Sequence, residues 1–136
     1  MGLRIASKLD EQTETLIYNV IGAAIEVHRE LGPGYLEKVY EKAMSLELTH
    51  RKLEHATQVP VAVYYKGEKI SGQVMDIVVR GRVLIELKSV ESILPIHEAQ
   101  VLSYLKSTGA PAALLINFKE VILKKGIKRF IQSPRD

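Results

Sequence analysis

The stretch that decides the fold is 73–90, with the sequence QVMDIVVRGRVLIELKSV. Two runs rich in apolar and β-branched residues lie on either side of Arg80-Gly81-Arg82, a pattern typical of two strands joined by a tight turn. If these three residues form the turn, the hairpin places Asp76 opposite Glu86. The other facing pairs are then Val79 with Val83 and Ile77 with Ile85. The stretch therefore predicts an antiparallel hairpin that brings two carboxylates together.

These charged residues interrupt strands that are otherwise apolar. Side chains alternate along a strand, so Glu86 and Lys88 share a face, and Asp76 interrupts the face formed by Val74 and Val78. Opposed Cβ atoms lie about 4.5–5.5 Å apart, where like charges destabilise a sheet. Mg²⁺ or Mn²⁺ between the two carboxylates would remove that repulsion, because both ions prefer oxygen ligands. We expect a metal site at Asp76 and Glu86, with Lys88 holding a water or an oxyanion.

Two other interpretations of Asp76, Glu86 and Lys88 stay open. The three residues could form a surface charge cluster of the kind common in hairpins, or Lys88 could be the ion-pair partner of Glu86. The apolar run Val83 to Leu87 indicates a central strand, where burying an unpaired carboxylate is costly. Glu86 therefore needs a positive charge beside it, from a metal or from Lys88.

The rest of the chain predicts helices and further strands around this hairpin. Leu16, Val20, Ala23 and Val27 recur at spacings of three and four, the pattern of one buried helical face. Three helices are expected, over 10–31, 36–52 and 95–108. Five strands are expected, over 59–65, 73–80, 82–90, 112–118 and 127–131. The order ααβββαββ around a central mixed sheet is an α/β fold, and the length fits a single domain, 1–136.

In the second helix, Leu36, Tyr40 and Leu46 are expected on the buried side and Glu41 on the solvent side. Glu37 lies at the N-terminal edge of the buried side and could reach a metal through a water. The simpler interpretation is that Glu37 gains about 0.3–1 kcal/mol from the helix dipole. Glu37 is thus a candidate ligand with a structural alternative.

The third helix carries a polar face made of His97, Gln100 and Tyr104. Gln100 could hold a ligating carboxylate or a water, although polar faces of this kind are more often solvated. Neither His97 nor His28 is expected to act as a catalytic base.

Composition limits the classes of protein that remain. The chain has no cysteine, which excludes disulfides, thiolate zinc sites and a cysteine nucleophile. It has no apolar run of signal-peptide type and no membrane span of about 18 residues, so a cytoplasmic protein is expected. A net charge of +3 does not by itself establish a nucleic-acid partner.

Basic residues gather near the C-terminus, and Glu120 is the acidic residue among them. They are Lys119, Lys124, Lys125, Lys128, Arg129 and Arg135. This cluster could bind a phosphate backbone by displacing its counterions, although a solvated surface is the simpler interpretation.

The run Gly34-Tyr35-Leu36-Glu37-Lys38-Val39-Tyr40 resembles the GxxExxY signature of a family of small bacterial and archaeal proteins assigned to the PD-(D/E)XK nuclease superfamily. The resemblance covers nearly the whole chain, including Asp76, the run 85–91, His97-Glu98-Ala99-Gln100 and the run 114–118. One departure is Gln73-Val74-Met75, which precedes Asp76 where related nucleases often carry a Pro or a Gly-x-x-Asp turn. The resemblance implies a restriction-endonuclease-like fold and Mg²⁺-dependent cleavage of phosphodiester bonds.

The same resemblance implies a role for each candidate residue. Asp76 and Glu86 match the metal ligands, Lys88 the catalytic lysine and Glu37 the accessory helix acid. Gln100 and Tyr104 resemble the QxxxY motif of the exonuclease-like branch, which implies that both belong to the catalytic site.

Three functions are compatible with this sequence. The first is a Mg²⁺- or Mn²⁺-dependent nuclease of low sequence specificity, with DNA a more natural substrate than RNA. The second is a non-catalytic nucleic-acid-binding or assembly module that keeps the nuclease fold, an interpretation with which a homodimer is compatible. The third is a defence-linked nuclease whose activity waits for a protein partner.

Overall fold

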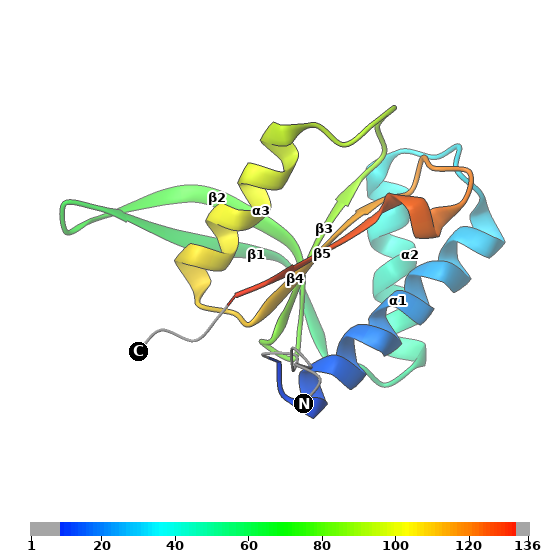
Figure 1. Ribbon diagram of the computed structural model, residues 1–136, viewed down its shortest axis with the longest axis horizontal. Helices are drawn as coiled ribbons and strands as arrows, with labels where there is room; N and C mark the ends of the chain where they lie inside the picture. The colour runs from blue at the N-terminus through cyan, green and yellow to red at the C-terminus, as the bar shows by residue number, and fades with distance from the viewer. Residues whose placement is uncertain (1–8, 133–136) are drawn as a thin grey trace, which may run out of the picture.

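The structure is a computed structural model and describes residues 9–132. Its elements are α1 (Glu11–Leu31), α2 (Glu37–His50), β1 (His55–Tyr65), β2 (Glu68–Val79), β3 (Val83–Lys88), α3 (Pro95–Thr108), β4 (Ala112–Asn117), a 3₁₀ turn (Leu123–Gly126) and β5 (Ile127–Ile131). The strands form one sheet in the order β1-β2-β3-β4-β5, in which β3 and β4 are parallel and the other neighbours antiparallel. The expected order ααβββαββ is confirmed (Figure 1).

Local sequence explains where α1 and α3 begin and end. Asp10 caps α1, because its Oδ1 accepts the Thr13 backbone N–H at 2.7 Å. Pro95 opens α3, and Gly109 ends it in the left-handed conformation at φ 73°, which glycine adopts without strain. Both helices therefore end close to the expected residues.

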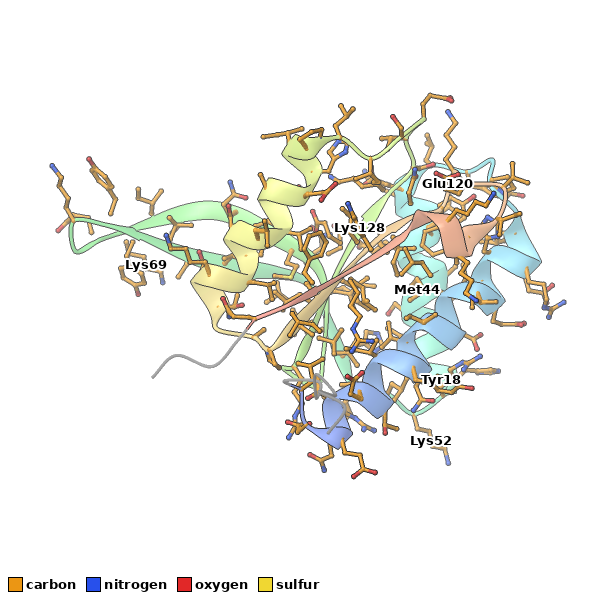
Figure 2. All side chains as sticks on the ribbon, viewed as in Figure 1. Tyr18, Met44, Lys52, Lys69, Glu120 and Lys128 are labelled. Carbon is orange, nitrogen blue, oxygen red and sulfur yellow. The ribbon has the colours of Figure 1, made fainter. Side chains whose placement is uncertain are left out.

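The sheet separates two apolar cores. On one face, α1 and α2 pack against the β3 side chains Val83, Ile85 and Leu87. Figure 2 shows Met44 of α2 among the packed side chains of this layer. On the other face, α3 packs against Leu84. Because side chains alternate, Glu86 and Lys88 lie on the α3 side of the sheet.

The hairpin register agrees with the expectation as far as Ile77. Val79 pairs with Val83 and Ile77 with Ile85, and the paired region ends there. Beyond this point Met75 packs into the α3 core, whereas Ile77 packs into the α1–α2 core. Regular alternation along 73–80 would place Met75 and Ile77 on one face, and this expectation is wrong, because the alternation of β2 breaks at Asp76.

The break in β2 has a matching irregularity in β1. Gln58 lies between the paired residues Thr57 and Val59 and has φ 51°, a left-handed value that is uncommon for a residue with a side chain. Beyond it, β1 and β2 continue as a two-stranded ribbon that leaves the sheet and turns at Lys66-Gly67 (Figure 1). We call this ribbon, residues 59–75, the arm. Figure 2 places Lys69 on the arm, away from the helices.

The buried side of α2 is smaller than expected. Tyr40, Met44 and Leu48 are buried, but Leu36 is 77% exposed and Leu46 58% exposed, so these two expectations are wrong. Leu36 is the N-cap residue, which precedes the first helical turn, and Leu46 lies on a face that no other element covers closely enough to bury it. Within residues 9–132, no helix combines the length and the apolar character needed to cross a bilayer.

Candidate functional site

Glu86 is a buried carboxylate in the middle of the sheet. It lies on β3 between β2 and β4, and only 6% of the residue is exposed. Its neighbours along the strand, Ile85 and Leu87, are almost completely buried on the opposite face. The interpretation of the charged hairpin residues as a surface cluster therefore does not hold for Glu86.

Asp76 and Glu86 are held together by two reciprocal hydrogen bonds. The backbone N–H of Leu87 donates to Asp76 Oδ2 at 2.7 Å, and the backbone N–H of Asp76 donates to Glu86 Oε1 at 3.3 Å. Each carboxylate thus binds the opposite strand at the point where regular β2–β3 pairing has ended. The expected proximity of the two acids is present, and side-chain bonds hold them there.

Asp76 affects the charge of Glu86. Burial, and after it the negative charge of Asp76, raise the pKa of Glu86 to about 8, while the Asp76 N–H and the Lys88 ammonium act in the opposite direction. Glu86 on its own therefore holds a proton near neutral pH. A cation at this position would favour the ionised form.

Lys88 follows on the same face of β3. Its Nζ lies 4.0 Å from Glu86 Oε2, and its side chain is only 17% exposed. Lys88 also donates a hydrogen bond to Gln100 Oε1 of α3 at 3.5 Å. The ion-pair interpretation of Lys88 is thus compatible with this geometry, and Gln100 contacts the lysine.

Tyr104 is buried between α3 and β2. Its hydroxyl donates to Gln73 Oε1 at 3.0 Å and lies 3.2 Å from the Val74 carbonyl. Burial raises the pKa of Tyr104, with added contributions from the charges of Glu86 and Asp76. Tyr104 therefore holds the segment of β2 that leads directly into Asp76.

Glu37 approaches the pair from α2. The residue is exposed, but partial burial of its carboxyl group raises its pKa, as does the charge of Asp76, while Lys88 lowers it. Glu37 thus lies close enough to Asp76 and Lys88 for their charges to shift its pKa. Within the described part of the chain, Glu37 makes no direct hydrogen bond or ion pair with Asp76 or Lys88.

Glu41, one turn further along α2, is a site residue that sequence reasoning missed. Its Oε1 accepts a hydrogen bond from Gln58 Nε2 at 2.7 Å. Burial raises the pKa of Glu41, and the charge and hydrogen bonding of Asp76 raise it further. Its spacing of four residues from Glu37 was the available signal, because such residues share a helix face.

His28, His97 and three of the C-terminal basic residues have partners within the chain. His97 Nδ1 accepts the Leu94 N–H at 2.9 Å, and His28 Nε2 lies 2.7 Å from the Glu120 carbonyl. The ion pairs of the basic cluster are Lys119 with Glu91, Lys128 with Glu98 and Arg129 with Glu14. Arg135 lies outside the described residues. These pairs favour the interpretation of the cluster as a solvated surface.

Comparison with known proteins places this chain in a family. Residues 14–130 match the family described as the PD-(D/E)XK nuclease superfamily. The chain belongs to this superfamily. A solved structure, "Crystal structure of SSO0001", has a similar fold, with a TM-score of 0.50 and 22% identity over 91% of this chain. This chain spans 63% of the length of that one. No curated protein matches the sequence.

The expected restriction-endonuclease-like core is confirmed by this membership and by the mixed sheet flanked by helices. Members of the PD-(D/E)XK superfamily are generally nucleases that use divalent metals. In this member, no group of three or more His, Cys, Asp or Glu side chains within residues 9–132 is arranged to hold a metal ion. Asp76 and Glu86 still fit Mg²⁺, which commonly binds one or two carboxylates and keeps several waters.

Proposed function

We propose that this protein is a Mg²⁺- or Mn²⁺-dependent nuclease that hydrolyses phosphodiester bonds, preferring DNA to RNA, with low sequence specificity. The observation that carries the proposal is the pair formed by Asp76 and the buried Glu86, with Lys88 next to Glu86 on β3. Two carboxylates at such close range, one of them in the middle of a sheet, are unfavourable without a cation. We take residues 1–136 as one nuclease domain.

Each residue near the pair has a role that follows from its contacts. A bound metal would neutralise phosphate charge and make a water molecule a better nucleophile. Asp76 and Glu86 would hold that metal. Lys88 supplies a positive charge for the developing charge on the phosphate, Gln100 orients the lysine, and Tyr104 holds the β2 segment that positions Asp76.

The two acids of α2 support the same site through water. The charge of Asp76 raises the pKa of both Glu37 and Glu41, which lie one turn apart on one face of α2. Waters kept by a Mg²⁺ ion are hydrogen-bond donors that carboxylates accept well. We assign Glu37 and Glu41 to those waters rather than to the ion itself.

We also propose that the chain belongs to the GxxExxY group. The supporting observation is the position of Tyr40, whose hydroxyl donates to the Gly32 carbonyl and accepts the Tyr35 N–H at 3.1 Å. Its ring stacks on Phe118, with centroids 4.5 Å apart. These contacts hold the start of α2 against the sheet, which gives the glutamate of the signature, Glu37, its place near Asp76.

Calorimetric titration of Mn²⁺ into the wild type, Asp76→Ala and Glu86→Ala tests this function. Cleavage of single-stranded, duplex and branched DNA and RNA is measured alongside it. We expect binding and Mn²⁺-dependent cleavage in the wild type and loss of both in the two variants. The matched control is Glu30→Ala, which removes an exposed glutamate at the end of α1. A wild type that binds no metal, even with nucleic acid present, contradicts the proposal.

The second candidate is a non-catalytic nucleic-acid-binding module that keeps the fold. The observation in its favour is the Lys88 ammonium, which lies 4.0 Å from Glu86 and can serve as the positive partner in place of a metal. In that case the titration gives no heat of binding, and Lys88→Met destabilises the protein because Glu86 loses its partner.

A further inference from the structure

A groove lies between the arm and α3, beside the carboxylate pair. Its volume is about 930 Å³. The arm contributes Ala62, Val63, Tyr64 and Gln73 to its walls, and α3 contributes residues between Ile96 and Ser107. Figure 1 shows α3 crossing the part of the arm nearest the sheet, and the two elements are in contact through β1. We call this feature the arm groove.

The arm groove is continuous with the candidate site. Gln73, Gln100 and Tyr104 all line it. Tyr104 is hydrogen-bonded to Gln73, and Gln100 accepts a bond from Lys88 of the site. A chain that occupies the groove is therefore led toward Lys88 and the carboxylates.

The charge of the arm groove suits a polyanion. Among the residues that line it, Lys106 carries a positive charge, and within residues 9–132 the lining contains no aspartate or glutamate. Ser103 and Ser107 add hydroxyl groups. The groove lining thus carries a net positive charge, which attracts phosphate groups.

The apolar wall of the groove suits unpaired bases. Tyr64 is 66% exposed and Ile96 69% exposed, and both line the groove together with Val63 and Ala99. An aromatic ring and aliphatic side chains can contact the face of a base only when that base is not stacked inside a duplex. A duplex presents phosphates and groove edges instead, which the apolar wall does not bind.

We propose that the arm groove binds a single-stranded segment of the substrate, with a base stacked on Tyr64 and the backbone near Lys106. This inference deepens the proposed function, on which it rests for the fate of the bound strand. The preferred substrate is then a single strand, or a duplex with an unpaired end or branch, that enters along α3 toward Lys88.

The test is fluorescence anisotropy of labelled oligothymidylate, oligouridylate and a blunt DNA duplex of equal length, with EDTA present so that no cleavage occurs. We expect the wild type to bind a single strand more tightly than the duplex. Tyr64→Ala weakens single-strand binding about 5-fold or more, the effect of losing one stacked base. Tyr64→Phe keeps the aromatic ring, so we expect it to bind the single strand as tightly as the wild type does. The two oligonucleotides distinguish DNA from RNA.

The neighbouring tyrosine gives a matched control. Tyr65 is 62% exposed on the same strand but does not line the groove, so Tyr65→Ala leaves binding unchanged. Lys106→Gln weakens binding, whereas Lys69→Gln, away from the groove, has a smaller effect. Equal behaviour of Tyr64→Ala and Tyr65→Ala, or tighter binding of the duplex, overturns the inference. So does a dimer that buries Tyr64 and competes with the oligonucleotide.

The two proposals fail separately. Suppose that metal-dependent cleavage is lost in Asp76→Ala but unaffected by Tyr64→Ala, and that the protein has no preference for single strands. The nuclease function then stands, and the proposed role of the arm groove is wrong. If single-strand binding depends on Tyr64 but no cleavage occurs with Mg²⁺ or Mn²⁺, the proposed role of the arm groove stands and the nuclease function is wrong.

Discussion

Lys88 lies between a buried carboxylate and an amide. Its distances of 4.0 Å to Glu86 Oε2 and 3.5 Å to Gln100 Oε1 fix the ammonium at the edge of the site. From that position it can interact with a phosphate without being a metal ligand. Its contribution should therefore concern the rate of cleavage and not the binding of the ion.

Lys88→Met tests this separation, because methionine keeps much of the length of the side chain and removes the charge. We expect cleavage to slow by about 10²–10³-fold, the effect of losing one donor to a developing negative charge. Mn²⁺ affinity should stay the same or increase, since the ion no longer competes with the ammonium. Single-turnover cleavage and calorimetric titration measure the two quantities. Parallel loss of both would show that Lys88 organises the metal site.

Glu41→Gln tests the acid that sequence reasoning missed. Losing one partner of a metal-bound water typically weakens metal affinity by about 10–100-fold, and we expect an effect of that order. Glu47→Gln is the control, because Glu47 lies further along the same helix and pairs with Arg51 at 2.8 Å. Mn²⁺ titration of both variants is the measurement. Indistinguishable affinities would exclude Glu41 from the site.

At the scale of elements, α3 contacts β2 through apolar packing around Met75 and through the Tyr104 hydroxyl. The contact between Tyr104 and the Val74 carbonyl lies two residues before Asp76. The carboxylate thus depends on a helix that is distant in the sequence. A small change in this helix should reach the metal site.

Tyr104→Phe removes only that hydroxyl. We expect a loss of about 1 kcal/mol in the free energy of unfolding, the usual effect of one hydrogen bond. We also expect slower cleavage, because the β2 segment before Asp76 is less constrained. Urea denaturation and cleavage assays measure the two effects. Thr49→Ala is the control, since its hydroxyl donates within α2, to the Ser45 carbonyl at 2.9 Å, and Thr49 does not line the arm groove. Unchanged cleavage in Tyr104→Phe would limit Tyr104 to a packing role.

The elements differ in how far the sequence could predict them. The β2–β3 register was correct because Gly81 and two apolar runs leave few alternatives, and α3 was correct because Pro95 and Gly109 mark its ends. The outer part of β2 was missed. Residues 68–72 are exposed and mostly polar, and they form a strand only because β1 is there to pair with them.

The candidate site shows the same limit. Asp76, Glu86 and Lys88 could be brought together from the turn at Gly81 and the alternation of side chains along 82–90. Glu41 could not, because its approach to Asp76 depends on how α2 packs and on the left-handed backbone of Gln58. No local pattern in the sequence encodes that contact.

At the scale of the whole molecule, the site draws on both layers of helices. Glu86 and Lys88 face α3, yet Glu37 and Glu41 reach Asp76 from α2, which packs on the opposite face of the sheet. This is geometrically possible because β2 and β3 stop pairing at Ile77. The opening between these strands lets side chains from both faces meet.

Burial of Glu86 makes the stability of the metal-free protein depend on pH. Its pKa rises from 4.5 to about 8 on folding, so the folded state binds more protons than the unfolded chain between these values. The free energy of unfolding should therefore fall as pH increases through this range, by at most about 1.4 kcal/mol per pH unit for one group. The raised pKa values of Glu37 and Glu41 act in the same direction.

Urea denaturation in EDTA across this pH range measures the slope. Glu86→Gln, which cannot ionise, should flatten it, and saturating Mn²⁺ should restore stability at the alkaline end in the wild type but not in the variant. A wild type whose stability is constant or increases with pH would show that Glu86 is ionised without a metal.

The arm also bears on how copies of this protein avoid one another. β1 is the outer strand of the sheet, and long exposed edge strands readily pair with those of other molecules. Pro60 lacks an N–H to donate, and the left-handed backbone at Gln58 bends the same edge. The irregularity that opens the sheet beside Asp76 thus also interrupts the template on which fibrous aggregates would grow.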